Sequence, residues 1–581
     1  MRILGVSAFY HDSAAALLID GDIHCAVQQE RLSRIKHDST FPSLAIDWCL
    51  ERGGISADDL DAVVFYEKPF RKLDRILVNA IDAFPNGWRV FPHILKNLLS
   101  EKLWVAGVIA AELGVRRQKI LFTSHHESHA AAAFLASPTF DAAIVTVDGV
   151  GEWATATVSQ GRRTPDGACS IELLQEIRFP HSLGMLYSTF TAYLGFEVND
   201  GEYKVMGLAA YGRPTCVDVI RRMVEMRPDG SFALDLDYFE FHRSVRSSYS
   251  QRLVSELGAP RNAALPIDLT SVDGQRYADI AASVQQILGE AMVGLARAAA
   301  RATGAEDLCL GGGVALNGCA NVRVLQDSGF RRVFVPPSPG DSGCAIGAAL
   351  YADRIHFGCA DRLVGDHSYW GPSIDPEELQ RLAREDGLVC ECFALPDLIE
   401  FVARRIAEGA VVAWTEGRCE FGPRALGHRS LLANALDATA KDRLNRFIKR
   451  REDFRPFAPS VPADRLQQYF CASAEGARLA RFMSGVFPVR AEWRDRLRAV
   501  THVDGTARVQ AVHEDIAPNF YALLHAVERH VGVPIVLNTS LNIAGEPIAA
   551  TIAEAYSTFR RGPIDFIVAA PYVVHQSEKP A

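Results

Sequence analysis

Apolar residues in this 581-residue chain recur in short runs separated by polar or glycine-rich loops, a pattern typical of buried β-strands. Residues 3–7 and 14–20 flank a polar loop, and residues 143–148 and 153–159 flank a glycine loop. Each pair predicts a β-hairpin whose tight turn carries polar groups. Helical patterns follow both hairpins, so two parts of the chain share one layout.

This repeated layout resembles the way in which a duplicated ribonuclease-H-like ATPase begins its two halves. The resemblance implies hairpin loops that face each other across a cleft and hold phosphates. A glycine triplet at residues 311–313 ends a third apolar strand and precedes a helical pattern. Backbone N–H groups at such a turn bind anions or lie against a nucleotide. A tight strand-to-helix turn is the alternative interpretation of the triplet. We predict an α/β N-terminal domain over residues 1–365.

A second α/β domain is expected over residues 375–581. Glycines and prolines between residues 363 and 378 indicate a linker near position 370. Helical periodicity at 398–406 and an apolar strand at 409–414 follow it.

Arginines cluster in the loop that follows this strand, residues 416–430, where they alternate with glycines. The forked guanidinium group suits phosphate or carboxylate oxygens. A second basic run covers residues 441–455, for which a solvated helix face is the alternative. We predict a polar anion pocket in the second domain. Its candidate residues are Arg418, Arg424, Arg429, Lys449, Arg450, Arg455, Arg508, Asn538 and Ser540.

Two histidines four residues apart, His125 and His129, fall on one face of a predicted helix, which is metal-ligand spacing. The best third ligand is Asp341, a carboxylate in the glycine-rich turn at 336–343. Two imidazoles and one carboxylate leave positions open for exogenous oxygen atoms. The alternatives are histidines satisfied within the core or on the surface, and an aspartate that only caps a turn.

Composition narrows the class of protein. A hydrophobic content of 48% and a charged content of 23% are those of a soluble globular protein. The net charge of −9 argues against a broad nucleic-acid footprint or an anionic-membrane surface, since both need a concentrated positive field. The 12 scattered cysteines suggest neither a zinc cluster nor a disulfide framework. With no membrane-length apolar segment, we expect a cytoplasmic protein.

Several short blocks, spread in order over nearly the whole chain, resemble one known family. They are residues 7–15, 30–42, 125–129, 148–152, 204–209, 311–317, 422–427, 449–452, 455–459 and 538–540. The chain is similar in these blocks to the O-carbamoyltransferases, a family that includes nodulation protein U and the cephalosporin and tobramycin carbamoyltransferases. The departures are small: Gln29 replaces a common glutamate, and Leu541 replaces a common phenylalanine.

The resemblance implies an N-terminal actin-like ATPase domain of the duplicated ribonuclease-H-like kind and a C-terminal YrdC-like α/β domain. It implies an ATP-dependent transferase that moves the carbamoyl group of carbamoyl phosphate, via carbamoyl-adenylate, to a hydroxyl of a small-molecule acceptor such as a secondary metabolite or sugar. Carbamoyl phosphate would bind the C-terminal arginines. ATP and a divalent metal, iron(II) with magnesium as a second candidate, are the implied cofactors. The acceptor stays open, and so does the assembly state, for which a homodimer is one option.

Roles for individual residues follow from this resemblance. An alcohol is a poor nucleophile at neutral pH and needs a base, for which we choose His11, with Asp12 and Lys36 as further catalytic residues. A hydrogen-bonded loop histidine is the alternative for His11. The metal on His125, His129 and Asp341 would clamp phosphate oxygens. The candidate adenylate-binding residues are Asp148, Gly149, Gly151, Glu152, Lys204, Gly311, Gly312, Gly313 and Asn317.

Three rival functions compete with this interpretation. A non-haem iron oxygenase also uses two histidines and a carboxylate, but leaves the arginine-rich domain unexplained. A nucleotide-dependent switch or binding ATPase is compatible with the fold, which does not fix function. A tRNA-modifying enzyme is disfavoured by the lack of a basic stretch beyond the local pocket. Dependence on carbamoyl phosphate would separate the transferase from the oxygenase and from the switch.

Overall fold

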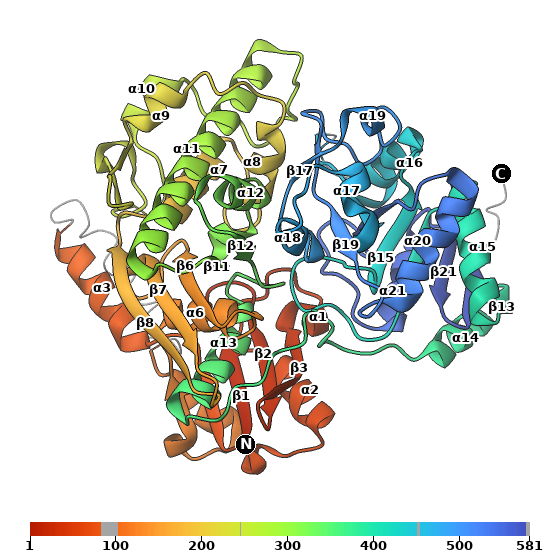
Figure 1. Ribbon diagram of the computed structural model, residues 1–581, viewed down its shortest axis with the longest axis horizontal. Coiled ribbons are helices and arrows are strands. Elements are labelled where there is room, and N and C mark those ends of the chain that lie inside the picture. Colours follow the sequence, from red (N-terminus) through yellow and green to blue (C-terminus); the bar gives the residue numbers. More distant parts are fainter. Residues whose placement is uncertain (83–102, 245, 450–451, 453, 577–581) are drawn as a thin grey trace. The chain divides into compact units, whose positions relative to one another are not determined.

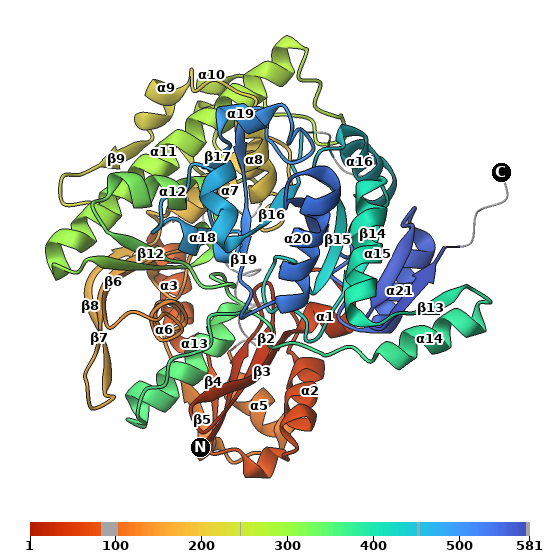
Figure 2. The same ribbon diagram turned by 45° about the vertical axis from the view of Figure 1, so that its right-hand side comes forward.

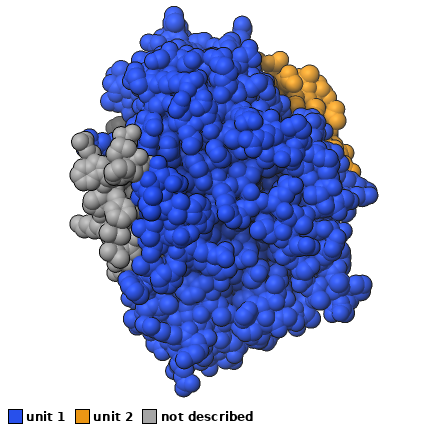
Figure 3. Space-filling view, turned by 90° about the vertical axis from the view of Figure 1, so that its left-hand side faces the viewer, with its two compact units in different colours: residues 1–29, 37–366 blue, residues 30–36, 367–581 orange. Residues whose placement is uncertain are grey.

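The computed structural model of the chain divides into two compact units. Unit 1 comprises residues 1–29 and 37–366, and unit 2 comprises residues 30–36 and 367–581, as coloured in Figure 3. No sequence pattern indicated that the short segment 30–36 packs within unit 2. The described part of the chain consists of residues 1–82, 103–244, 246–449, 452 and 454–576.

Unit 1 contains two five-stranded sheets with the same topology. The strand orders are β3-β2-β1-β4-β5 and β12-β11-β6-β7-β8. In each sheet three strands form an antiparallel meander; a fourth strand pairs in parallel with the first strand of the meander, and a fifth pairs in parallel with the fourth. The strands are β1 (Arg2–Ser7), β2 (Ala14–Ile19), β3 (Asp22–Gln28), β4 (Ala62–Phe65), β5 (Ile120–Phe122), β6 (Asp141–Val147), β7 (Ala154–Arg163), β8 (Cys169–Arg178), β11 (Asp307–Gly311) and β12 (Arg332–Phe334). Both predicted hairpins, β1–β2 and β6–β7, are confirmed.

Two helices lie between the sheets of unit 1, as Figures 1 and 2 both show. Helix α6 (His125–Phe134) packs on β6 and β11, helix α13 (Gly343–Tyr351) packs on β1, β2 and β4, and the two helices pack against each other. The contact is close because α13 carries a glycine there: a Cβ at Gly347 would lie 1.9 Å from the backbone oxygen of Ser128. Helix α6, with its histidines, therefore lies against α13 and against strands β6 and β11.

Further helices cover the outer faces of unit 1. The longest, α11, packs against α7, α8, α9, α12 and β6 and buries a continuous apolar stripe. A small sheet pairs β9 (Val224–Met226) with β10 (Phe232–Leu234). The helices are α2 (Ser43–Gly53), α3 (Pro69–Asp82), α5 (Val105–Leu113), α7 (Leu183–Tyr193), α8 (Glu202–Ala209), α9 (Val217–Arg221), α10 (Gln251–Leu257), α11 (Val272–Thr303) and α12 (Gly318–Asp327).

Unit 2 is built on one mixed eight-stranded sheet, in the order β13-β22-β21-β14-β15-β20-β16-β19. Helices α15 and α20 pack together, and their apolar residues share one core cluster with β14, β15, β20 and β21. The predicted helix at 398–406 and the predicted strand at 409–414 are found, with shifted ends. The main elements are α14 (Pro376–Glu385), β13 (Cys390–Cys392), α15 (Leu395–Ala407), β14 (Val412–Thr415), β15 (Arg429–Asn434), α16 (Ala438–Arg443), β16 (Ala458–Pro462), β19 (Gln510–Val512), α20 (Pro518–Val531), β20 (Val536–Ser540), α21 (Ile552–Arg561), β21 (Phe566–Ala569) and β22 (Tyr572–His575).

The predicted α/β fold class is confirmed, and the repeated strand order of unit 1 agrees with the predicted duplicated ribonuclease-H-like arrangement. The YrdC-like character of unit 2 stays a prediction. The duplicated strand order of unit 1 is the decisive feature, because the two hairpins predicted from sequence occupy equivalent places in the two sheets. Among the described residues, no helix has the length and apolar character needed to cross a bilayer.

Candidate functional site

Helix α6 presents its histidines from a firmly held N-terminus. Ser124 is the N-cap, and a reciprocal capping box joins it to Glu127. The carboxylate of Glu152 accepts the backbone N–H of His125 at 3.0 Å and that of Lys68 at 2.8 Å. Both the capping pair and the carboxylate suit the partial positive charge of a helix start. The first turn of α6 is thereby fixed in position relative to the loop that follows β6.

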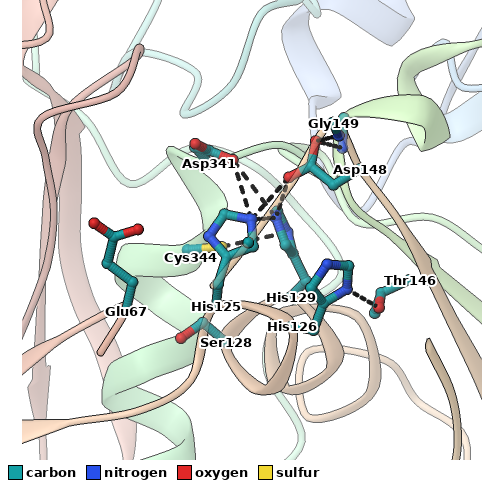
Figure 4. Close-up of polar contacts among 12 residues, drawn as sticks. Glu67, His125, His126, Ser128, His129, Thr146, Asp148, Gly149, Asp341 and Cys344 are labelled. Carbon is teal, nitrogen blue, oxygen red and sulfur yellow. Dashed lines mark hydrogen bonds and ion pairs between the residues drawn. The ribbon is translucent and has the colours of Figure 1, made fainter. Parts of the chain in front are cut away.

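Four buried side chains converge beside this first turn: His125, His129, Asp148 and Asp341 (Figure 4). Asp148 Oδ2 lies 2.8 Å from His125 Nε2 and 3.1 Å from His129 Nε2. The two Nε2 atoms are 3.1 Å apart, and Asp341 Oδ1 is 3.5 Å from that of His129 and 3.9 Å from that of His125. One candidate ligand atom from each residue lies within 4.8 Å of all the others.

These distances fit a shared cation. Ligand atoms held at about 2.1 Å from one ion are roughly 3.0 to 3.4 Å apart at octahedral or tetrahedral angles. Within the described part of the chain, neither carboxylate oxygen of Asp341 has a hydrogen-bond donor, although the side chain is only 1% exposed. A buried carboxylate without donors is costly unless a charge compensates it. The four residues therefore form a donor set that suits a divalent metal.

The electrostatics of the cluster agree with this arrangement. Burial alone would lower the pKa of His129, but the Cys344 thiol and the carboxylates of Asp148 and Asp341 hold that pKa well above its usual value. Burial alone would raise the pKa of Asp148, yet contacts with His125 and His129 keep it well below its usual range. The two carboxylates thus favour a positive charge beside them in a buried site.

The third histidine of the motif, His126, has a structural role. Its Nδ1 lies 2.6 Å from the hydroxyl of Thr146, and its Nε2 lies 2.9 Å from the backbone oxygen of Ala154. Since a carbonyl only accepts, Nε2 carries the proton and Nδ1 accepts from the hydroxyl. Burial is the main cause that lowers the pKa of His126 to about 3. This neutral ring ties α6 to β6 and to the start of β7.

Asp148 also connects the two glycine loops. Its Oδ1 accepts the backbone N–H of Gly149 at 2.8 Å and that of Gly313 at 3.3 Å. Gly312 adopts a φ of +89°, and a Cβ there would lie 2.2 Å from the backbone oxygen of Val147. The turn after β11 can therefore approach the end of β6 only because residue 312 is glycine.

Other predicted adenylate residues lie at different places around these loops. Glu152 caps α6, and Asn317 caps α12 by accepting the N–H of Ala320 at 3.0 Å while its amide pairs with Gln285. Gly151 packs closely against His125, and Gly311 against the backbone of α6. Lys204 lies on α8, with its ammonium group 5.7 Å from the centre of the Phe196 ring. Their contact with a nucleotide stays a prediction.

The predicted base His11 belongs to a hydrogen-bonded chain of four side chains. His11 Nδ1 lies 3.0 Å from Asp12 Oδ2, and Asp12 Oδ1 lies 2.7 Å from His37 Nδ1. His37 Nε2 in turn lies 3.0 Å from Asp200 Oδ1. Burial alone would lower the pKa of His11, but Asp341, Asp12 and Asp148 raise it to about 9. Lys36 lies in the segment that packs within unit 2.

In unit 2, Glu420 organises the predicted anion loop. One of its carboxylate oxygens accepts the backbone N–H groups of Leu426, His428 and Arg429, at 2.7, 2.9 and 3.2 Å. The His428 ring stacks on Tyr369 with centroids 3.6 Å apart and planes inclined by 6°. The loop backbone is thus rigidly shaped between these contacts.

Arg429 differs from the other predicted anion contacts. Its guanidinium is fully buried, and its N–H groups are donated to backbone oxygens of the surrounding loops. Asn538 is also buried, and its amide donates to Ser460 and Gln510, whose own amide holds the backbone oxygen of Leu426. Both residues therefore shape the loop, and neither presents a donor that is free for phosphate.

The remaining anion candidates are less enclosed. Arg418 donates to the backbone oxygens of Trp370 and Gly371. The guanidinium Nη1 of Arg455 lies 3.6 Å from the carboxylate Oε2 of Glu452. Arg424 and Arg508 are half-buried, and Ser540 donates to Asn542. Arg450 and the side chain of Lys449 lie outside the described residues. Their roles, like that of Arg424, stay predictions.

Sequence reasoning missed three residues of the N-terminal arrangement. Asp148 was assigned to the nucleotide alone, although its position directly after a buried strand that faces a His-x-x-x-His helix is a signal for a fourth ligand. His37 and Asp200 were not considered, and no spacing rule links them, since the fold alone joins positions 163 residues apart.

Comparison with known proteins agrees with the two-unit architecture. A family model described as carbamoyltransferase N-terminus matches residues 2–350, and one described as carbamoyltransferase C-terminus matches residues 403–576. Nodulation protein NolNO of Sinorhizobium fredii is 36% identical over 98% of this chain and 79% of its own length. The uncharacterized protein sll1178 of Synechocystis is 40% identical over 100% of this chain and 97% of its own. Nodulation protein U of Rhizobium tropici is 28% identical over 95% and 93%.

Proposed function

The chain belongs to the carbamoyltransferase family, and on that premise we propose that it is an ATP-dependent O-carbamoyltransferase. It moves the carbamoyl group of carbamoyl phosphate, through carbamoyl-adenylate, to a hydroxyl group of a small-molecule acceptor. The observation that carries the proposal is the buried cluster of His125, His129, Asp148 and Asp341, joined through Asp148 to two glycine loops.

The donor set of the cluster fits iron(II) or another divalent first-row ion, because it combines two imidazoles with two carboxylates. When bound there, such an ion would supply positive charge to the phosphate oxygens of a nucleotide. Asp148 holds the N–H groups of Gly149 and Gly313 in place beside the cluster. The glycine turns after β6 and β11 are thereby held together beside the cluster, which supports a nucleotide site at the two loops.

The loop around Arg424 in unit 2 supports the carbamoyl phosphate step. Glu420, Arg429 and Asn538 hold its backbone, so that the half-buried guanidinium of Arg424 is presented on a rigid support. In this step carbamoyl phosphate would release phosphate and leave carbamate, which is short-lived in water. Its decomposition is reduced if it is consumed within the same protein. Arg424, Arg455 and Arg508 are the proposed contacts for the anion.

His11 is the proposed base in the transfer step. Its Nδ1 faces Asp12, so its Nε2 is the ring atom that accepts the hydroxyl proton. With a pKa near 9, the ring would be protonated at neutral pH because Asp341 and Asp148 attract the proton. A divalent ion on those carboxylates would counter this attraction and lower the pKa of His11 toward the range of a working base.

The test begins with purified protein, ATP and magnesium or iron(II), without an acceptor. Carbamoyl-adenylate, detected by mass spectrometry, and pyrophosphate release are expected only when carbamoyl phosphate is added. Arg424→Ala should abolish both signals, and Arg498→Ala, which changes an exposed arginine of the same unit, should leave them unchanged. ATP turnover that is indifferent to carbamoyl phosphate would contradict the proposal and favour a nucleotide-dependent switch.

Metal binding is tested separately. Protein equilibrated with iron(II) under anaerobic conditions should retain a stoichiometric amount by elemental analysis, and His129→Ala should lose it. His530→Ala, a change at a surface histidine paired with Glu400, is the matched control. Equal metal content in all three proteins would rule out the cluster as the binding site.

A further inference from the structure

We propose that His37 and Asp200 are positioning residues for carbamoyl transfer, which hold Asp12 and, through it, the ring of His11. The inference rests on the proposed function for the role of His11. It concerns two residues that touch no reacting atom and that belong to distant parts of the sequence of unit 1.

The geometry is a continuous chain of alternating imidazoles and carboxylates. The three joining distances are 3.0 Å from His11 to Asp12, 2.7 Å from Asp12 to His37, and 3.0 Å from His37 to Asp200. The side chains are between 22% and 32% exposed, so the chain is partly shielded from water. In each contact one carboxylate oxygen faces one imidazole nitrogen, and these contacts define the orientation of both rings.

The protonation of His37 follows from its partners. Its two ring nitrogens face the carboxylates of Asp12 and Asp200. A carboxylate only accepts hydrogen bonds, so both nitrogens carry protons and His37 is an imidazolium between two anions. This cation holds Asp12 Oδ1, and Asp12 Oδ2 is then turned toward His11 Nδ1–H.

The consequence for transfer is an oriented His11. The acceptor O–H bond breaks as its proton passes to His11 Nε2, while the acceptor oxygen forms a bond to the carbamoyl carbon. The bond from that carbon to the adenylate oxygen breaks, and AMP leaves with the electron pair. Asp12 stabilises the His11 imidazolium that forms, provided that His37 and Asp200 keep its carboxylate in this orientation.

Backbone strain gives a second, independent observation. Asp12 and His37 have φ values of +54°, and Asn199, directly before Asp200, has a φ of +70°. Non-glycine residues in the left-handed region are uncommon, and a cluster of them persists only where the surrounding structure holds them. Three such residues at the joints of one hydrogen-bonded chain indicate that the placement of these side chains is maintained against its conformational cost.

The kinetic test separates the two half-reactions. Wild type, His37→Ala, Asp200→Ala and the control His530→Ala are compared for carbamoyl-adenylate formation and for transfer to methyl glucoside as a probe hydroxyl compound. Transfer turnover should fall about 10- to 100-fold in the first two variants, the scale expected for loss of an orienting partner. Adenylate formation and the KM for ATP and carbamoyl phosphate should stay within about threefold, whereas general damage to the fold would impair both half-reactions.

A conservative change supplies a rescue. In Asp200→Asn the introduced amide can donate to Nε2 of a neutral His37, whose Nδ1 still donates to Asp12. Transfer in Asp200→Asn should therefore exceed that in Asp200→Ala. Equal transfer in wild type and His37→Ala would overturn the inference while leaving the proposed function intact.

A spectroscopic test does not depend on any acceptor. In protein labelled with nitrogen-15 histidine, the His37 ring should show two protonated nitrogens, and Asp200→Ala should shift the Nδ1–H signal of His11 through His37 and Asp12. A single protonated nitrogen at His37, or an unmoved His11 signal, would overturn the inference. Failure of wild type to form carbamoyl-adenylate would instead contradict the proposed function.

Discussion

The two hairpin loops of unit 1 occupy equivalent places in its two sheets but differ in chemistry. The first hairpin loop, residues 8–13 between β1 and β2, contains His11 and Asp12. The second hairpin loop, residues 148–153 between β6 and β7, contains Asp148 and two glycines. The two loops occupy repeated places in the fold, but the first carries an imidazole and a carboxylate, for which we propose proton transfer. The second carries a carboxylate of the candidate metal cluster beside two glycines.

The backbones of the loops differ in a related way. In the first hairpin loop Phe9 and Asp12 adopt φ values of +74° and +54°, so the loop maintains strained non-glycine residues. In the second hairpin loop neither glycine is in the left-handed region. A Cβ at Gly149 would make only ordinary van der Waals contacts, and the nearest atom, the Tyr10 hydroxyl oxygen, would lie 3.8 Å away. Glycine at position 149 is therefore required neither by the backbone conformation nor by close packing.

The largest expected effect comes from Asp148→Asn. The introduced amide can still accept from the two loop N–H groups but removes the negative charge that His125 and His129 face. We expect roughly 100- to 1000-fold lower carbamoyl-adenylate formation, together with loss of bound metal. Steady-state rates and elemental analysis measure this. Asp141→Asn, at the exposed opposite end of β6, is the control, and equal losses in both variants would refute the assignment.

A smaller and more selective effect is expected from His11→Asn. Removal of a general base typically costs about 100-fold in the step that it serves. Transfer to a hydroxyl probe should fall by that factor while metal content and adenylate formation persist. If His11→Asn instead abolished adenylate formation, the two hairpin loops would share one role and the contrast between them would be wrong.

The pH dependence of the unfolding free energy tests the charge on His11 in the first hairpin loop. The folded pKa of His11, about 9, lies above its ordinary 6.5, because Asp341, Asp12 and Asp148 outweigh the effect of burial. Protonation of His11 therefore favours the folded state: this contribution is complete below pH 6.5 and is lost as the pH rises through about 9. In chelator, we expect a loss of roughly 3 kcal/mol of unfolding free energy over that window. Urea titrations should show it in wild type and not in His11→Asn.

The smallest effect on stability is expected from Gly149→Ala. Because its backbone is not left-handed and its surroundings leave room, the unfolding free energy should change by less than about 1 kcal/mol. Any loss of nucleotide-dependent activity would then report on ligand approach. Gly312→Ala is the contrasting variant and should be clearly destabilised, since its Cβ would collide with Val147. Destabilisation of equal size in both would show that Gly149 is structural.

Local patterns predicted much of the fold and part of the site. Short apolar runs on either side of a polar or glycine loop identified β1–β2 and β6–β7, and helical spacing placed His125 and His129 on one face of α6. Their convergence with Asp341, more than 200 residues away in the chain, was only inferred from residue type. The arginine loop was found as a cluster, but sequence could not separate Arg429, whose donors are consumed by backbone oxygens, from the half-buried Arg424.

By itself, the sequence determined the strands, the helix that carries the histidines and the chemical types of the candidate residues, because these depend on periodicity and side-chain chemistry over a few residues. Only the tertiary structure decided which of those residues meet. Asp148 became a fourth member of the cluster, and His37 joined Asp12 to Asp200, because packing of distant segments sets side-chain distances to within an ångström. Spacing along a chain cannot supply that precision.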